Sequence, residues 1–465
     1  MLVDRYTPED VFARIPEMAT RTDPILRQMD RLLDDDPLFQ QVKADLIRRY
    51  PQTACHGRHS TPVEVILRLL VVKHLQQWSF AETEQWVGDS LALRWFTRVY
   101  FQAVPDDTTL IRWANVIEPT TLHALNDRVA ALAQELKVTK GRKLRVDGAV
   151  VQTAIHHPTD SSLLTDGVRV LGRLVRRSKP LVGAHLAGVR DAFRSRLRTM
   201  RRGLQAIHRT ARQKGEGVAE QRTALYQKLV ATTQQTMAQA QRVREALGAM
   251  NDEAPREAQR LREQFDHFLP LVEQVITQAR RRVLQGEKVP ASEKVVSLFA
   301  PHTQIIRRHK SGAEVEFGRM VFVGETEGGI ISSYQILTNS GSEQDAVLPA
   351  VEHHKDVFRH APRLLTGDRG THSATIERDA RAAGVRDVII PYSGPRSPAR
   401  RTQEKERRWR RLYRWRAGIE GRIYSLQRDY GLERCAYQGD DGLERGVGWG
   451  ILASNLRHIG QALAA

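Results

Sequence analysis

The sequence predicts a mixed α/β protein whose strand-containing core is interrupted by a long helical insertion. Two features of the chain lead to this fold class. Short apolar runs of strand type lie at residues 143–151 and again at 314–337, 363–367 and 385–392. The first 135 residues, and the stretch between the first two runs, instead carry apolar residues at helical spacing.

The composition indicates a polyanionic partner without identifying it. The chain has 465 residues, with 72 Lys and Arg against 54 Asp and Glu, a net charge of +18 and a pI near 10.2. A ribosomal or membrane-surface protein would show the same balance. The N-terminus lacks the basic start and apolar core of a signal peptide, and no apolar run approaches the roughly 18 residues of a membrane span. We therefore expect a cytoplasmic protein of a bacterium.

Residues 1–135 are predicted to form a helical N-terminal domain. An amphipathic helix begins after Thr61 and Pro62, and SFAETEQWVGDSLALRWF and PDDTTLIRWANVI follow as short helices separated by turn residues. Two short helices around a tight turn suggest a helix-turn-helix DNA reader. A helical cap packed on the core explains the same pattern equally well.

Residues 171–300 are predicted to form the helical insertion. From about residue 180 to 286 the chain indicates three helices of about thirty residues, broken at 215–217 and around 251–255. Apolar stripes on the second and third helices predict that these two pack as a hairpin. Arginine clusters such as RSRLRTMRRG would suit DNA phosphates, although a charge run is usually a solvated face. Dimer contact, DNA clamp and inert spacer all remain open as roles.

Residues 136–170 and 301–465 are predicted to form the core. After the first strand and the insertion come a hairpin at 314–337, a helix from about Asp345 to Arg359, a strand ending at Asp368, a helix at 373–383, a strand at 385–392 and a last helix. This order matches a ribonuclease H-like core, with the insertion between its first and second strands. In such a core the first strand carries one aspartate, the fourth ends at another, and the last helix brings a glutamate.

Carboxylates in this order point to metal-dependent phosphoryl chemistry. Asp147 interrupts the first apolar strand, and Asp368 follows a later strand at a glycine-flanked turn. In YRWRAGIEGRIYSLQ, Arg416, Glu420 and Gln427 follow Tyr413 at offsets of three, seven and fourteen, so that on one regular helix they share a face. Two divalent cations about 3.5–4 Å apart need carboxylate oxygens from several chain segments.

These segments resemble the DDE transposases of bacterial insertion sequences, in the branch with a tyrosine, arginine, glutamate and lysine signature. The signature spacing of two, three and six intervening residues is kept, with glutamine at position 427 in place of lysine. VDGAVVQTAIHHPTDSSLLTDGVRVL and PDDTTLIRW extend the resemblance over most of the chain outside the insertion. The chain looks closest to the group labelled ISNCY.

The resemblance implies an enzyme that cleaves the ends of its element and joins their 3′-hydroxyls to target DNA by two-metal phosphoryl transfer. Asp147, Asp368 and Glu420 would bind two Mg²⁺ ions, with Mn²⁺ as an alternative, and the expected DNA contacts are Tyr413, Arg416, Gln427 and Arg369. The implied partners are double-stranded DNA, as terminal inverted repeats and as target, and a second copy of the chain in a homodimer. The protein would associate with the nucleoid when it acts.

Each acidic residue also has an ordinary structural explanation. Asp147 would pair with Arg145, Asp368 would form a turn before Gly370, and Glu420 would pair with Arg416 or Arg422. Their joint occurrence in the expected order favours metal binding. Tyr413 is expected to bind a phosphate instead of acting as a nucleophile, because no His-hydrophobe-His metal pair accompanies it. Two other functions stay open: a catalytically silent DNA-binding protein derived from a transposase, and a standalone metal-dependent nuclease.

Overall fold

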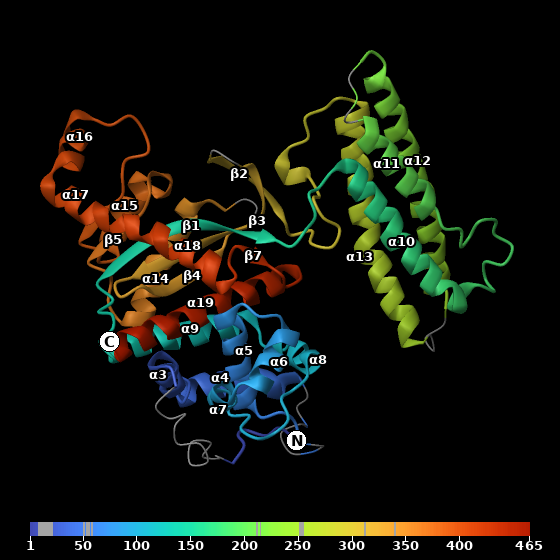
Figure 1. The fold of residues 1–465 in the computed structure, drawn as a ribbon. Coiled ribbons are helices and arrows are strands. Elements are labelled where there is room, and N and C mark those ends of the chain that lie inside the picture. Colours follow the sequence, from blue (N-terminus) through green and yellow to red (C-terminus); the bar gives the residue numbers. More distant parts are fainter. Residues whose placement is uncertain are drawn as a thin grey trace. The chain divides into compact units, whose positions relative to one another are not determined.

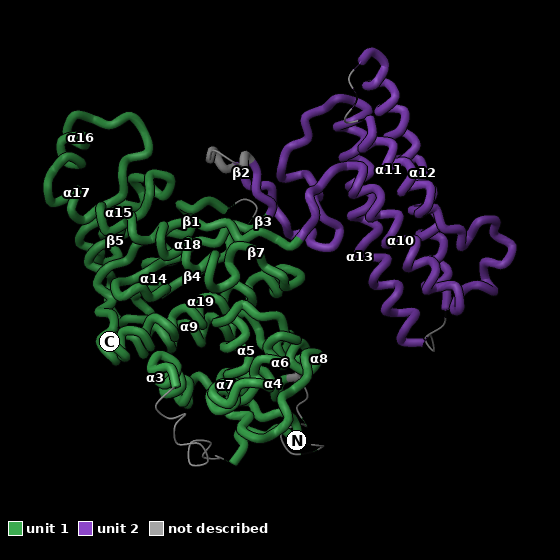
Figure 2. Tube along the Cα trace, in the orientation of Figure 1, with its two compact units in different colours: residues 1–154, 318–465 green, residues 155–317 purple. Residues whose placement is uncertain are grey.

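The chain forms two compact units. The computed structural model describes residues 1–7, 22–49, 52, 56, 59–210, 213, 215–250, 255–310, 313–338 and 341–465. Unit 1 comprises residues 1–154 and 318–465, and unit 2 comprises residues 155–317 (Figure 2). Unit 2 begins before residue 171, where the insertion was predicted to begin, because its first helix starts at Asp160. Within the described ranges, no helix is long and apolar enough to cross a membrane.

The N-terminal part of unit 1 is helical, as predicted (Figure 1). Its helices are α3 (Pro24–Leu32), α4 (Asp36–Arg49), α5 (Val63–Gln76), α6 (Phe80–Asp89), α7 (Leu91–Phe96), α8 (Asp107–Ala114) and α9 (Pro119–Glu135). Helix α5 was predicted to be amphipathic, and this is wrong, since even Glu64 and Arg68 are buried. The helix is enclosed because α4, α18 (Gly418–Tyr430) and α19 (Gly439–Ala464) all pack against it.

The PDDTTLIRW segment begins helix α8. Asp106 is its N-cap, and its carboxylate accepts a hydrogen bond from the backbone nitrogen of Thr109 at 2.8 Å. Hydrogen bonds from the Thr108 side chain and from Thr109 hold the pKa of the Asp106 carboxyl at about 2. This aspartate therefore has a clear structural role at the start of a helix.

A mixed sheet lies at the centre of unit 1. Strand β1 (Lys143–Thr153) pairs antiparallel with β3 (Ala313–Thr326) and parallel with β5 (Leu364–Thr366), which pairs parallel with β6 (Asp387–Ile389). Strand β4 (Ile330–Ile336) pairs antiparallel with β3, which confirms the predicted hairpin. Gly328 and Gly329 turn this hairpin with φ of 86° and 77°, a region that favours glycine. The two-residue strand β7 (Arg434–Cys435) pairs with the end of β1.

Alternate side chains of the sheet enter two different cores. On β3, Val321 and Val323 pack in the core that contains residues of α5, α9 and α19, whereas Phe322 packs with α14 (Glu343–Phe358) and α15 (Ala374–Ala382). The two-residue period of a strand therefore places helices on both faces of the sheet. The remaining helices of unit 1 are α16 (Pro398–Lys405) and α17 (Arg407–Arg414). The observed order of hairpin, helix, strand, helix, strand and helices agrees with the prediction.

Unit 2 is mostly helical. Its helices are α10 (Asp160–Val182), α11 (Leu197–Thr210), α12 (Val218–Gly248) and α13 (Arg256–Ala279), and strand β2 (Gln304–Lys310) follows them. The two predicted breaks fall between α11 and α12 and between α12 and α13, and the predicted stripes of α12 and α13 share one buried core. The first predicted helix is instead two helices. Gln239 of α12 donates hydrogen bonds to the carbonyls of Asp191 and Ala192 at 3.2 and 2.7 Å. These bonds give partners to backbone carbonyls in the non-helical segment that connects α10 to α11.

Arg68→Met is predicted to destabilise unit 1 by about 1.5–3 kcal/mol, because it would remove the charged hydrogen bonds of Asp30 and Glu64 to a fully buried cation and leave these carboxylates mainly to Arg98. Arg68 is fully buried and binds Asp30, Asp34 and Glu64 at 2.8, 2.6 and 3.1 Å. All seven tryptophans lie in unit 1, so tryptophan fluorescence in a urea titration follows this unit.

The matched control is Arg378→Met. This arginine is 73% exposed and pairs with its neighbour Asp379, so its replacement should cost no more than about 0.5 kcal/mol. Equal urea midpoints for the two variants would contradict the role given to Arg68.

Candidate metal centre

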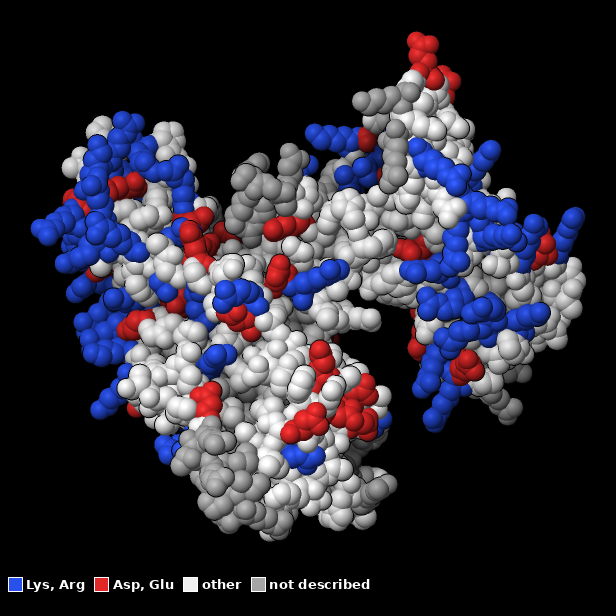
Figure 3. All heavy atoms as spheres, in the orientation of Figure 1, with Lys and Arg blue, Asp and Glu red and all other residues white. Residues whose placement is uncertain are grey.

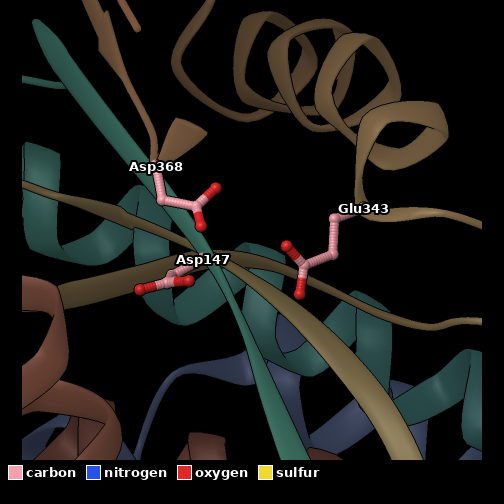
Figure 4. A group of neighbouring side chains, drawn as sticks. All are labelled: Asp147, Glu343 and Asp368. Atoms are coloured by element: carbon pink, nitrogen blue, oxygen red, sulfur yellow. The ribbon is translucent and has the colours of Figure 1, made fainter. Parts of the chain in front are cut away.

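Three carboxylates from separate chain segments converge in unit 1. Asp147 lies on β1, Glu343 is the first residue of α14, and Asp368 follows β5. One oxygen of each carboxylate lies within 4.8 Å of the others, and Figure 4 shows Glu343 and Asp368 turned toward β1 at Asp147. All three residues are half-buried. The structure thus brings together the two aspartates that the sequence singled out and adds a glutamate that it did not.

Glycine at position 148 makes room for Glu343. A β-carbon on residue 148 would lie 2.1 Å from Oε1 of Glu343, far inside van der Waals contact. The backbone nitrogen of Gly148 also donates a hydrogen bond to Oδ1 of Asp147 at 2.9 Å. Asp147 therefore supplies one carboxylate of the group, and Gly148 leaves the space that the Glu343 carboxylate occupies.

The turn that carries Asp368 is fixed from two sides. Oδ1 of Asp368 accepts a hydrogen bond from the backbone nitrogen of Thr371 at 3.0 Å, so the expected turn-forming role of Asp368 is present. Gln344 donates from its side chain to the carbonyls of Gly370 and His372, each at 3.0 Å. Since Gln344 follows Glu343 directly, these bonds hold the start of α14 against the Asp368 turn.

Glu343 was missed because α14 begins two residues before the predicted start at Asp345. Ser342 caps the helix, and its side chain and that of Asp345 bind each other's backbone nitrogens in a capping box. The pattern Ser-x-x-Asp at 342–345 was the local signal for this start. As the first helical residue, Glu343 lies at the end of α14 where the helix dipole favours negative charge.

Glu420 lies outside the group of three and is connected to it through Arg416. Nη2 of Arg416 binds Oδ2 of Asp147 at 2.8 Å, and Nη1 binds Oε1 of Glu420 at 2.7 Å. The Glu420 side chain is 64% exposed. The expected structural pairing of Glu420 with Arg416 is therefore observed, and the same arginine places Glu420 beside Asp147.

The single regular helix predicted for Tyr413, Arg416 and Glu420 is interrupted. Tyr413 belongs to α17 and Glu420 to α18, with Arg416 in a 3₁₀ turn at Trp415–Ala417 between them. The cause is Arg145, whose Nη1 donates to the carbonyl of Trp415 at 2.6 Å. A β-carbon on residue 418 would lie 2.2 Å from this Nη1, so glycine is needed where the guanidinium meets the helix.

Arg145 is engaged by a different carboxylate from the one expected. It pairs across the sheet with the fully buried Glu325, with Nη2 to Oε1 at 2.6 Å and Nε to Oε2 at 2.7 Å. Arg145 and Glu325 are also register partners of β1 and β3. The expected pairing of Asp147 with Arg145 is thus replaced by pairing with Arg416.

Burial and neighbouring charges perturb the acidic groups. Burial raises the pKa of the Asp147 carboxyl; Arg416 opposes this shift and Asp368 adds to it. Burial likewise raises the pKa of the Tyr413 hydroxyl, against the opposing effect of Arg416. Burial therefore opposes ionisation of the Asp147 carboxyl, while the raised pKa of the Tyr413 hydroxyl means that it keeps its proton at neutral pH.

Of the other predicted DNA contacts, Tyr413 and Arg369 lie beside this centre, and Gln427 lies further along β1. Tyr413 is half-buried and stacks on Trp409, with ring centroids 4.9 Å apart. Arg369 follows Asp368, is exposed, and has no ion pair among the residues the structure describes. Gln427 donates from Nε2 to the carbonyl of Val150 at 3.0 Å, which ties α18 to β1.

The donor set suits a hard divalent cation. Three carboxylates offer oxygens within 4.8 Å of one another, and carboxylate oxygens are the ligands that Mg²⁺ and Mn²⁺ prefer. The group contains no thiol or imidazole, which would favour softer metals. Asp147, Glu343 and Asp368 therefore fit a divalent metal. Glu420 is linked to Asp147 through the guanidinium of Arg416.

Two segments of the chain match known protein families. Residues 13–115 match the family described as transposase domain (DUF772), and residues 294–456 match the family described as transposase DDE domain. The second match covers Glu343, Asp368 and Glu420, whereas Asp147 lies before it. No curated protein and no solved structure matches the chain significantly.

Mg²⁺ is predicted to raise the melting temperature of unit 1 through this centre. A ligand that binds only the folded state stabilises it by about 2.7 kcal/mol at about 100 times its Kd. Asp147→Asn and Glu343→Gln should reduce the shift followed by tryptophan fluorescence. Glu352→Gln, at an exposed position on the same helix, should keep it.

Asp147→Asn should not lower the melting temperature in EDTA. The folded-state pKa of Asp147 is raised, so its ionised form opposes folding as pH rises past the unfolded-state pKa, and asparagine removes this cost. An unchanged Mg²⁺ shift in Asp147→Asn would contradict the centre.

Gly148→Ala is predicted to weaken the Mg²⁺ response as much as Glu343→Gln does. The added β-carbon meets the flexible end of Glu343, so the fold should persist while the carboxylate is displaced. The double variant Gly148→Ala with Glu343→Gln should show the same Mg²⁺-induced shift in melting temperature as either single variant. Gly88→Ala is the control, because a β-carbon there meets no atom within 4 Å. A full Mg²⁺ shift in Gly148→Ala would show that Glu343 is dispensable.

Proposed function

We propose that this chain, whose two family matches support a DDE-type transposase of an insertion sequence, cleaves the ends of its element and joins the freed 3′-hydroxyls to target DNA. Its substrates would be the terminal inverted repeats and a target duplex, at the bacterial nucleoid. The observation that carries the proposal is the convergence of Asp147, Glu343 and Asp368 in a chain with two transposase-domain matches.

We assign metal binding to Asp147, Asp368 and Glu420 and add Glu343 to this set. The expected ions are two Mg²⁺, with Mn²⁺ as an alternative. When bound, they would activate the attacking oxygen and stabilise the leaving oxygen of phosphoryl transfer. Glu420 is supported by its link through Arg416 to Asp147, and Glu343 by its place within 4.8 Å of both aspartates.

The cationic and phenolic groups would hold the DNA backbone. Arg369 is exposed beside Asp368, and its planar guanidinium suits a bidentate phosphate contact. Arg416 would neutralise Asp147 and Glu420 and contact the DNA end. Tyr413, with its raised pKa, would donate a hydrogen bond to a phosphate and would be a weak nucleophile.

Gln427 is assigned a positioning role. Its bond to Val150 holds α18 on β1, and α18 carries Glu420. The DNA contact implied by its place in the signature stays a prediction. Lysine at this position would keep a hydrogen-bond donor but would bring a positive charge to a half-buried position that is now neutral.

We further propose a ribonuclease H-like core. It is supported by the strand order β3-β1-β5-β6, with β3 antiparallel to β1 and the rest parallel, and by the helical segment that separates β1 from β3 in the chain. The signature spacing supports the tyrosine-arginine-glutamate-lysine branch, and the resemblance over most of the chain outside the insertion supports the ISNCY group. Action as a homodimer and DNA contact by the short N-terminal helices follow from the same resemblance.

The proposal is tested with purified protein, Mg²⁺ and labelled DNA spanning the ends of its own element. Wild type should cut at the element ends. Asp147→Asn and Glu420→Gln should bind the ends as wild type does but cut at least about 100-fold more slowly, because each removes a metal ligand. Glu352→Gln should cut normally.

Other results would lead to different functions. End binding without cleavage by wild type would make the chain a silent DNA-binding protein, and cleavage without preference for the ends would make it a nuclease. Normal cleavage by Glu420→Gln together with loss in Glu343→Gln would transfer the third catalytic carboxylate to Glu343.

A further inference from the structure

The positive charge of unit 2 is concentrated on two of its four helices. Between residues 169 and 209, which cover most of α10 and nearly all of α11, there are twelve Lys and Arg and a single acidic residue, Asp191. Helices α12 and α13 together carry seven Lys and Arg and six Asp and Glu. A bundle with evenly solvated charges would not show this difference between its halves.

Most of these cations have no carboxylate to neutralise them. Arg169, Arg177 and Arg194 pair with Asp166, Glu257 and Asp191. Eight others are exposed and have no ion pair with any residue that the structure describes: Arg173, Arg176, Lys179, Arg190, Arg198, Arg201, Arg202 and Arg209. We call these eight residues the α10–α11 surface. Eight exposed cations without carboxylate partners favour a polyanionic partner.

Helical spacing gathers these cations into stripes. Arg169, Arg173 and Arg176 follow one another at four and three residues on α10, and Arg198, Arg202 and Arg209 at four and seven on α11. The opposite faces of both helices are apolar and enter the core of unit 2 through residues such as Leu174 and Met200. In Figure 3 the Lys and Arg side chains gather over this unit with few acidic residues among them.

The chemistry of the surface favours nucleic-acid phosphates. Seven of its eight members are arginines, whose guanidinium forks bind phosphate oxygens in bidentate fashion. Duplex DNA presents one negative charge per about 1.7 Å of helix axis, a charge density that suits a surface carrying several cations.

We propose that the α10–α11 surface binds the sugar-phosphate backbone of duplex DNA without reading its sequence, as a contact separate from the metal centre. This proposal rests on the proposed function only for the identity of the polyanion, which is taken to be DNA. It requires neither metal nor an element end.

The test measures how the affinity of the full chain for DNA depends on salt. The probe is a duplex of about 30 base pairs, roughly three helical turns, that contains no element end, in EDTA. Each phosphate contact contributes about −0.9 to the slope of log K against log salt concentration. The triple variant Arg173→Gln, Arg198→Gln, Arg202→Gln should reduce the slope by about 2–3 and weaken binding at least about tenfold at 0.1 M salt.

The control is the triple variant Arg256→Gln, Arg260→Gln, Arg262→Gln, which removes the same charge from exposed positions of α13. It should keep nearly the wild-type slope. Replacing the three surface residues by lysine should also keep most of the slope, which separates lost charge from lost folding.

Equal slopes for the two glutamine variants, or a wild-type slope in the surface variant, would overturn the proposal. The surface would then fit an acidic protein partner. Because the probe lacks element ends and metal, this outcome leaves end cleavage untouched, and failure of cleavage would not affect the slope.

Discussion

Mutual repulsion among half-buried carboxylates is the constraint on which the candidate centre depends. Asp147, Glu343 and Asp368 lie within 4.8 Å of one another, and burial already raises the pKa of Asp147. Arg416 offsets part of this repulsion by binding Asp147 and Glu420 together. The start of α14 and the Gln344 hydrogen bonds hold Glu343 and Asp368 in place. The local architecture therefore stabilises an acidic arrangement that would be costly without cations.

A second ion pair, between Arg145 and the fully buried Glu325, positions that arginine. Arg145 and Glu325 bind each other across the sheet, and Arg145 also donates a hydrogen bond to the carbonyl of Trp415, where the regular helix is interrupted. The resulting turn holds Arg416 beside Asp147, two residues from Arg145 along β1. The strand that carries the first aspartate thus also sets the position of its partner. Unit 2 enters the chain after β1 without disturbing the pairing of β1 with β3.

The sequence located features that are local and missed those that depend on distant contacts. Asp147 and Asp368 were found because strand ends and glycine turns are readable within a few residues. Glu343 was missed because the start of α14 was placed two residues too late, and its place beside Asp147 also depends on the space that Gly148 leaves, far away in the chain. The break at Trp415 depends on Arg145, 270 positions earlier, and no periodicity signals it. The burial of α5 likewise depends on α18 and α19, which lie at the opposite end of the chain.

The most direct test of the account is a crystal structure of the protein with Mn²⁺ and anomalous diffraction data. The account predicts Mn²⁺ peaks at about 2.0–2.6 Å from carboxylate oxygens of Asp147 and Asp368, with Glu343 or Glu420 completing the ligands. An anomalous map with no peak at these residues, and with Arg416 alone occupying the space between Asp147 and Glu420, would contradict the metal centre.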